Sequence, residues 1–379
     1  MHRSRIFKNF YFTTLRNVTF RAMYQYSEEN SFPELLLSDV DSLLETGIPM
    51  ETGEEKPQLS FGVIADVQYA DADDGYNFSK TNRRYYRTAL KMLDKAVMIW
   101  NKDSLKKPQF VLQLGDAIDG LNKRQNTSES GLADVLKSFA NFEGCVYHIW
   151  GNHEYYNFTR EYLMKSSLYS GNTLHSTPVP GKVYYTCEPH PYLRIIALDT
   201  YEVSMLAKPA NTSQSQLANE YMANNLNRDK NSGAGLIGDM RRFVRFNGAL
   251  SEEQIKWMRT NLQEAERLRQ NVIIIGHCGV FAEATDPSCL CWNAPEVLQE
   301  IQANSDSVLC YLSGHDHAGG MAFDEKNILH IALPGVLENN IDSDFGTMYM
   351  YKERLDLVGN GRVPNLSIAL KYKLSDNNS

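Results

Sequence analysis

The chain has 379 residues, 42% of them hydrophobic, and can therefore bury the core of one large domain or two smaller ones. Its formal net charge of −8 argues against a protein that binds nucleic acid or an anionic membrane surface through its overall charge. No apolar run approaches the roughly 20 residues that cross a bilayer. We therefore expect a globular, monomeric protein with neither nucleic acid nor membrane as a partner.

The first 27 residues contain several arginines and lysines but no acidic residue, whereas residues 28–55 are acidic. A basic segment free of acids is typical of a mitochondrial transit peptide. A disordered extension, or upstream sequence before a start at Met23, would have the same composition. We expect residues 1–58 to be an N-terminal extension, and we expect a cytoplasmic location with the mitochondrion as the alternative.

From Leu59 onward, strand-like apolar runs alternate with helical patterns. Strands are expected at residues 59–67, 109–115, 145–150, 193–199, 272–276, 308–313 and 328–333. Apolar residues recur at helical spacing in residues 81–101 and in residues 252–268, which follow Ser251 as an N-cap. The alternation predicts a layered α/β fold with largely parallel sheets, in a folded domain that spans residues 59–375.

Two segments depart from this alternation. Residues 202–247 are polar and rich in Asn, Ser and Gly, and they are too long for an ordinary connection. We expect them to form an insertion or cap over one end of the sheet. Residues 346–373 alternate between apolar and polar side chains, and we expect them to complete a second sheet.

Residue types that bind metals follow most of the expected strands. Sites in α/β sheets form outside the carboxyl ends of strands, so these side chains can converge. Taken singly, each would more often cap a helix, make a turn or sit in the core. Their joint occurrence, four times directly after a glycine, indicates one site. The series reads D-x-Q, G-D-x-x-D, G-N-H-E, G-H and G-H-x-H, and it supplies Asp66, Gln68, Asp116, Asp119, Asn152, His153, Glu154, His277, His315 and His317.

Oxygen and nitrogen ligands without thiolate suit divalent Mn, Fe or Zn better than a structural zinc cage. The number of ligands fits two ions. Asp116 is the candidate bridge, because a carboxylate can offer one oxygen to each of two cations roughly 3.5–4 Å apart. Such a pair activates water and neutralises the charge on a phosphoryl group.

The series resembles the calcineurin-like metallophosphoesterase superfamily. The flanking segments "FGVIADVQYAD", "NRRYYR", "LQLGDAIDG", "GNHEYYNFTRE", "RFVRFNG" and "SGHDHAGG" are similar to its manganese-dependent ADP-ribose/CDP-alcohol diphosphatase branch, from Leu59 to about Pro364. The resemblance implies an α/β/β/α metallophosphoesterase sandwich, in which two mixed sheets are flanked by helices. It also implies two bound divalent ions, with manganese preferred and Mg, Fe or Zn as alternatives.

Carried over by position, the resemblance assigns the ligands and the acid–base group. The first metal would be held by Asp66, Gln68, Asp116 and His317, and the second by Asp116, Asn152, His277 and His315. His153 matches the histidine that donates a proton to the leaving oxygen or stabilises charge there. Asp119 matches the carboxylate that orients this imidazole, and Glu154 is expected to support the site from behind.

Gln68 departs from the common superfamily pattern, which has D-x-H where this chain has Asp66-x-Gln68. An amide oxygen is a harder donor than imidazole, and it should favour Mn or Mg over a zinc-like ion. The named branch carries Gln at this position as well. The departure therefore supports the more specific resemblance.

Substrate contacts are expected from an aromatic and basic cluster. An arginine could bind a second phosphate bidentately, and an aromatic ring could stack on a base. The alternative is that these side chains serve a helix core or face solvent. The candidates are Phe78, Arg83 and Arg84, together with Asn247 and Trp292, which rest on the resemblance alone.

These features predict a hydrolase that cleaves the pyrophosphate bond of a small nucleoside diphosphate conjugate, such as ADP-ribose or CDP-choline. The products would be a nucleoside monophosphate and a phosphorylated partner. A phosphomonoesterase, acting on nucleotides or on proteins, could use the same metal centre. A scaffold protein that has lost catalysis is the third alternative, although Asp116, Asn152 and His153 are all present.

Overall fold

The computed structural model describes residues 55–77, 80–102, 106–206 and 212–374. The expected N-terminal extension falls almost entirely outside these residues, as does Phe78. Among the described residues, no helix has both the length and the apolar character needed to span a membrane.

A mixed sheet of six strands carries the first three motifs. Its order is β17-β16-β15-β1-β4-β5, with β1 parallel to β4, β4 parallel to β5, and β1 antiparallel to β15. The strands are β1 (Leu59–Ile64), β4 (Phe110–Gln113), β5 (Cys145–His148), β15 (Phe345–Met350), β16 (Arg354–Asn360) and β17 (Leu366–Ala369). The alternating segment at the end of the chain forms strands, as predicted, but they extend the sheet of β1, β4 and β5 and do not complete a second one, because β15 pairs with β1.

A second mixed sheet has seven strands and carries the last two motifs. Its order is β13-β14-β12-β11-β8-β7-β6, and the four strands β14, β12, β11 and β8 run parallel. The strands are β6 (Ser176–Pro178), β7 (Tyr185–His190), β8 (Leu193–Ala197), β11 (Asn271–Ile275), β12 (Val308–Ser313), β13 (Gly320–Phe323) and β14 (Leu329–Ala332).

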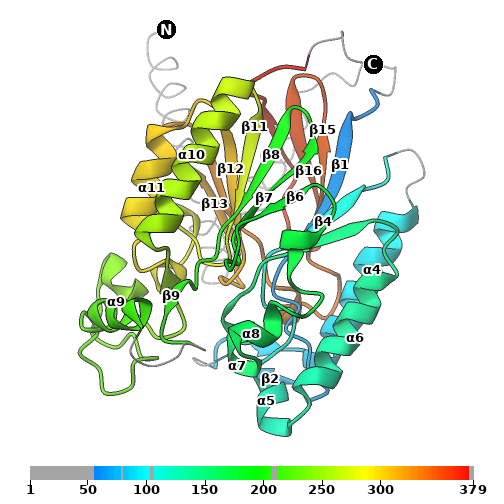
Figure 1. Ribbon diagram of the computed structural model, residues 1–379. Coiled ribbons are helices and arrows are strands. Elements are labelled where there is room, and N and C mark those ends of the chain that lie inside the picture. Colours follow the sequence, from blue (N-terminus) through cyan, green and yellow to red (C-terminus); the bar gives the residue numbers. More distant parts are fainter. Residues whose placement is uncertain (1–54, 78–79, 103–105, 207–211, 375–379) are drawn as a thin grey trace, which may run out of the picture.

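The two sheets pack face to face, and helices cover their outer faces. Successive residues of a strand point to opposite faces of its sheet, so a strand that is apolar throughout buries side chains on both faces. Phe61 and Val63 of β1 share one buried core with Ile273 and Ile275 of β11, whereas Ile64 belongs to the core under the helices. Figure 1 shows α10 (Glu252–Leu268) and α11 (Ala294–Ala303) outside one sheet, and α4 (Tyr86–Lys102) and α6 (Ser128–Ala140) outside the other. This is the expected α/β/β/α sandwich.

Each of the seven predicted strands overlaps an observed one, and α10 has the predicted bounds. The Ser251 side chain caps α10 by accepting a hydrogen bond from the Gln254 backbone N–H. The first predicted helix begins later than expected. Its first residues form β3 (Arg83–Arg84), which pairs with β2 (Gly75–Tyr76), and α4 starts only at Tyr86.

Short helices and the polar segment gather at the end of the sandwich where β1, β4, β5, β11 and β12 finish. Figure 1 places α5 (Leu121–Gln125), α7 (Asn152–Asn157) and α8 (Arg160–Leu163) at this end, together with α9 (Ser213–Met222) and β9 (Val203–Ser204) of the 202–247 segment. The latter strand pairs with β10 (Gly248–Ala249). All the motifs therefore open toward one region.

Candidate metal centre and substrate cavity

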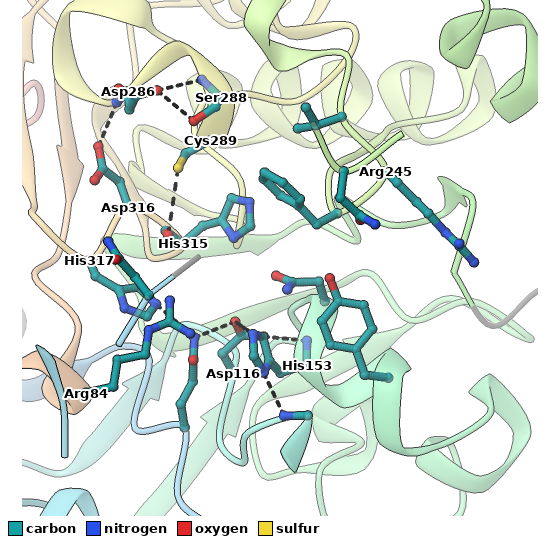
Figure 2. Close-up of a pocket in the computed structure, with 18 of the residues that line it drawn as sticks. Arg84, Asp116, His153, Arg245, Asp286, Ser288, Cys289, His315, Asp316 and His317 are labelled. Carbon is teal, nitrogen blue, oxygen red and sulfur yellow. Dashed lines mark hydrogen bonds and ion pairs between the residues drawn. The ribbon is translucent and has the colours of Figure 1, made fainter. Parts of the chain in front are cut away.

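A cavity of about 1100 Å³ lies at the carboxyl ends of the motif-bearing strands. Figure 2 shows Asp116, His153, His315 and His317 facing it from different loops. Gln68, Arg84 and Asn152 also line it, while Asp66 and His277 are fully buried directly behind. The structure therefore brings all seven predicted metal ligands and His153 together.

The first group of candidate ligands is closely spaced. The Gln68 amide nitrogen lies 3.0 Å from Asp116 Oδ2, 2.8 Å from His317 Nε2 and 3.4 Å from Asp66 Oδ1. His317 Nε2 is 3.4 Å from Asp66 Oδ1. Ligands about 2.1 Å from an octahedral ion lie roughly 3 Å apart, so this spacing fits a single ion.

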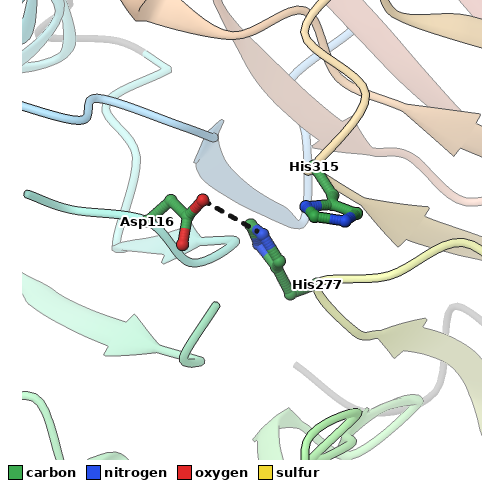
Figure 3. Close-up of side chains that lie close together, drawn as sticks. All are labelled: Asp116, His277 and His315. Carbon is green, nitrogen blue, oxygen red and sulfur yellow. Dashed lines mark ion pairs between the residues drawn. The ribbon is translucent and has the colours of Figure 1, made fainter. Parts of the chain in front are cut away.

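The second group centres on Asp116, His277 and His315, each of which offers one ligand atom within 4.8 Å of the others. Figure 3 shows the two imidazoles beside the carboxylate, with His277 Nε2 3.3 Å from Asp116 Oδ2. Asn152 Oδ1 is held by the hydroxyl of Tyr201 at 3.2 Å. These side chains are the expected ligands of a second ion.

Asp116 lies between the two groups. Oδ2 faces both Gln68 and His277, whereas Oδ1 accepts a hydrogen bond from the His153 backbone N–H at 2.8 Å. A carboxylate oxygen has two lone pairs, so the backbone N–H leaves Oδ1 able to bind an ion as well. The position of Asp116 between the two groups is compatible with the expected bridge.

The loops that present these ligands adopt unusual backbone conformations. Asp66, Gln68, Asp116 and His315 have φ angles of 52°, 43°, 56° and 70°. Left-handed backbone costs non-glycine residues about 1–3 kcal/mol and is concentrated at functional sites. A Cβ on Gly151 would overlap Asp116 Oδ1, so the chain can pass this close to the carboxylate only at a glycine.

Hydrogen bonds fix which ring nitrogen each histidine presents. His277 Nδ1 donates to the Leu114 carbonyl at 2.7 Å, which leaves Nε2 with its lone pair toward Asp116. His315 Nε2 donates to Asn247 Oδ1 at 2.7 Å, and the Asn247 amide nitrogen in turn donates to two backbone carbonyls, which fixes the orientation of the amide. His315 therefore keeps Nδ1 free as a ligand atom.

His317 is oriented by Glu338, whose carboxylate accepts a hydrogen bond from Nδ1 at 3.0 Å. Glu338 lies at the end of the short 3-10 turn Val336–Glu338 and also accepts from Asn82 at 2.7 Å. His317 Nε2 is thereby left to bind a metal. Sequence reasoning missed Glu338, because it belongs to no motif.

The electrostatic environment sets different protonation states for the different candidate ligands. Burial alone would raise the pKa of Asp116, but the surrounding imidazoles, His277 first, hold it well below its usual range. Burial and the neighbouring His277 hold the pKa of His315 well below its usual range. Asp116 as an ionised carboxylate and His315 as a neutral imidazole are both suitable ligands. Against the effect of burial, Asp116 raises the pKa of His277 well above its usual range, and Asp66 and Glu338 raise that of His317 to about 9. Metal binding at these two rings would therefore displace a proton.

Four buried polar atoms in this region have no hydrogen-bond partner within the described part of the chain, namely Gln68 Oε1, His277 Nε2, Arg84 Nε and Asp119 Oδ2. The first two belong to candidate metal ligands. Buried polar atoms are nearly always satisfied, so orphaned ones require an explanation. Rotating the Gln68 amide by about 180° would exchange Oε1 with Nε2 and bring a hard oxygen among the ligands of the first group. The donor set therefore fits two divalent ions.

His153 lies beside the metal groups and is half-buried. Its Nδ1 accepts a hydrogen bond from the Gly120 backbone N–H at 2.9 Å, so the neutral ring carries its proton on Nε2. Nε2 lies 3.9 Å from Asp116 Oδ2. Asp119 Oδ2 lies 3.3 Å from Nδ1; in the charged ring, Nδ1 would carry a proton and donate to this oxygen in place of accepting from Gly120. The predicted neighbourhood of His153 and Asp119 is present.

Glu154 supports the site from behind, as expected. Its carboxylate accepts hydrogen bonds from the backbone N–H groups of Asp116, Ala117 and Gly151 at 2.9, 2.6 and 2.7 Å. Burial, together with the nearby Asp116, raises the pKa of Glu154 to about 8. This one side chain joins the loop after β4 to the start of α7.

The predicted substrate contacts lie in different surroundings. Arg84 lines the cavity, but Arg83 does not, and it pairs with Asp74 at 3.0 Å. Asn247 is fully buried behind His315. Trp292 is 1% exposed in a small apolar cluster, and its Nε1 donates to the Val244 carbonyl. The structure thus brings only Arg84 of these four to the cavity.

The 202–247 segment supplies one wall of the cavity, which sequence reasoning could place only in outline. Its lining residues include Leu206, Asp229, Arg241, Arg245 and Phe246. Tyr201, just before the segment, holds Asn152, and Asn247 at its end holds His315. Both ends are therefore tied to candidate ligands of the second ion.

The chain is similar to known proteins over most of its length. The sequence model of the family described as calcineurin-like phosphoesterase matches residues 59–319. The manganese-dependent ADP-ribose/CDP-alcohol diphosphatase of Mus musculus is 40% identical over 319 residues, which are 82% of this chain and 93% of the mouse protein. The Arabidopsis thaliana protein of the same name is 37% identical, over 83% of this chain and 98% of its own.

The chain is also similar to a solved structure over most of its length. The crystal structure of a dimetal phosphatase from Danio rerio superposes with a TM-score of 0.78 at 37% sequence identity. The alignment covers 83% of this chain and 99% of the fish protein.

Proposed function

This chain belongs to the calcineurin-like phosphoesterase family, and we propose that it is a manganese-dependent diphosphatase of nucleoside diphosphate conjugates such as ADP-ribose and CDP-choline. The observation that carries the proposal is the 40% identity to the mouse diphosphatase over 93% of that protein's length. The products would be a nucleoside monophosphate and a phosphorylated partner.

We propose that Asp66, Gln68, Asp116 and His317 hold one ion, and that Asp116, Asn152, His277 and His315 hold the other. The close spacing and orphaned atoms of these side chains support this assignment. When bound, such a pair activates a water molecule and neutralises charge on the phosphoryl oxygens. The Gln68 amide oxygen favours Mn or Mg over Zn, and Fe remains an alternative.

His153 acts on the leaving oxygen in this proposal. Its Nε2–H, set by the Gly120 donor to Nδ1, donates a hydrogen bond or proton there. Asp119 supports the charged form of the ring from 3.3 Å. The 202–247 segment acts as a cap, since its side chains line the cavity over the metal groups. The expected monomeric state and cytoplasmic location stay predictions.

Product analysis tests the proposal against the phosphomonoesterase alternative. ADP-ribose, CDP-choline, AMP and p-nitrophenyl phosphate are incubated with the protein and with Mn or Mg in turn, and the products are separated by chromatography. We expect Mn-dependent release of AMP and CMP from the conjugates, with AMP left intact. Release of phosphate from AMP or p-nitrophenyl phosphate, with the conjugates untouched, would establish the phosphomonoesterase instead.

A further inference from the structure

The cations that line the cavity fall into two classes. Arg241 pairs with Asp286 at 2.8 Å, and Arg84 lies 3.6 Å from Glu338. In the described part of the chain, no carboxylate lies within ion-pair distance of the other three, which are Lys123, Arg124 and Arg245. The protein, with its net charge of −8, thus leaves three cations facing the cavity without an acidic partner.

These three cations lie on the side of the cavity where His153 is found. Lys123 and Arg124 belong to α5, which follows Gly120, the residue whose N–H contacts the His153 ring. They come about one helical turn, or ~5 Å, after that contact. In the view of Figure 2, Arg84 and Arg245 lie on opposite sides of Asp116 and His153.

Arg245 reaches the same wall from the cap. It lines the cavity together with Tyr156, whose ring packs against His153 with the ring centroids 5.0 Å apart. Two separate elements, α5 and the 202–247 segment, therefore direct positive charge at the region beyond His153. The His153 ring itself lies between α5 and the metal groups, because Nδ1 contacts Gly120 and Nε2 lies 3.9 Å from Asp116 Oδ2.

The chemistry of the proposed function explains why positive charge at Lys123, Arg124 and Arg245 would assist the reaction. In pyrophosphate hydrolysis, a water oxygen forms a bond to one phosphorus, and the bond from that phosphorus to the bridging oxygen breaks. The bridging oxygen leaves with its electron pair on the second phosphate, and negative charge grows there. When an alcohol or phenol leaves instead, no second phosphate is present. Cations beyond the leaving oxygen therefore stabilise a pyrophosphate transition state specifically.

We infer that Lys123, Arg124 and Arg245 form an anionic subsite that binds the leaving phosphate of the conjugate. This inference rests on the proposed diphosphatase function and identifies the residues that select a pyrophosphate over a simple phosphodiester. The cavity of about 1100 Å³ has room for two phosphates and their substituents.

The test compares two substrates on one variant. The triple variant Lys123→Ala/Arg124→Ala/Arg245→Ala is assayed with ADP-ribose and with bis(p-nitrophenyl) phosphate, whose leaving group carries no phosphate. We expect kcat/KM for ADP-ribose to fall ~10- to 100-fold, and kcat/KM for the diester to stay within about twofold. Inhibition by the product ribose 5-phosphate should weaken in the same variant.

A matched control removes the same charge elsewhere. Lys91, Lys137 and Lys165 are exposed and do not line the cavity, so their triple alanine variant should leave both substrates unaffected. Equal losses with ADP-ribose and the diester, or no loss with ADP-ribose, would overturn the subsite. If the unaltered protein fails to hydrolyse ADP-ribose and CDP-choline, the proposed function fails, and the subsite fails with it.

Discussion

Glu338 accepts a hydrogen bond from Nδ1 of His317 at 3.0 Å, and it thereby directs the other ring nitrogen, Nε2, toward the candidate metal site. Burial would raise the pKa of Glu338, but hydrogen bonds from His317 and Asn82 lower it to about 2. The carboxylate is therefore ionised at any physiological pH. An ionised partner on Nδ1 makes Nε2 a stronger ligand.

The variant Glu338→Gln should weaken Mn²⁺ binding about 10- to 100-fold, because it removes the charge that supports His317. Calorimetric titration of the metal-free protein with Mn²⁺ measures this directly. Asp324→Asn is the matched control, since Asp324 makes a similar buried pair with His330 at 3.2 Å and does not line the cavity. If both variants bind Mn²⁺ as tightly as the unaltered protein, Glu338 does not support the metal site.

The variant Asp116→Asn should lose bound metal and activity together. Asp116 Oδ2 is the atom shared by both ligand groups, and an amide cannot supply the bridging charge. Metal content is measured by mass spectrometry after dialysis, and circular dichroism verifies that the fold is retained. A folded variant that still holds two ions per chain would rule out the bridge.

The variant His153→Ala should keep its metal and lose roughly 10²–10⁴ in kcat. None of the predicted ligand atoms belongs to His153, and its hydrogen bond to Asp116 comes from the backbone N–H, which the variant keeps. Asp119→Asn should have a smaller effect, because Asp119 acts through the ring. Full activity in His153→Ala would show that the leaving oxygen needs no help from this residue.

The variant Gln68→His should shift metal preference toward Zn without abolishing hydrolysis, because imidazole is a softer donor than an amide oxygen. The ratio of activities with Zn and with Mn, each at saturating metal, reports the shift. An unchanged ratio would mean that Gln68 does not set the preference. Loss of all activity in a folded variant would mean that the amide has a further role.

His148 lies outside the cavity lining, and we expect it to make the folded state less stable in acid. Burial lowers its pKa from 6.5 to about 4. Below pH 6.5 the unfolded state binds a proton that the folded state does not, so stability falls as the pH drops toward 4, by about 2 kcal/mol at pH 5. The variant His148→Gln should show a smaller loss between pH 7 and pH 5 in urea unfolding. An equal loss in both proteins would contradict this origin.

The strands and main helices were predictable because local sequence determines them. Buried strands read as continuous apolar runs, and α10 begins behind a serine cap, so both could be identified without any neighbour. The first helix was predicted too early, because residues 81–85 contain no glycine or proline that would mark its start. Arg83 and Arg84 form a short hairpin strand instead, and the Tyr85 N–H donates to the Leu337 carbonyl.

The ligands of the candidate site were predictable from motif order, but the side chains that hold them were not. Glu338 meets His317 across 21 residues, and Asn247 meets His315 across 68. Such partners have no fixed spacing, because they depend on how the loops pack. For the same reason, Asn247 and Trp292 were predicted as substrate contacts from the sequence, whereas the structure buries both side chains.

Two divalent ions are proposed to bind side by side at the ends of the two sheets. Anomalous diffraction from a crystal soaked in Mn²⁺ locates such ions without relying on activity. We expect two manganese peaks, one among Asp66, Gln68, Asp116 and His317, and one among Asp116, Asn152, His277 and His315. A single peak, or manganese bound away from Asp116, would contradict the dinuclear centre.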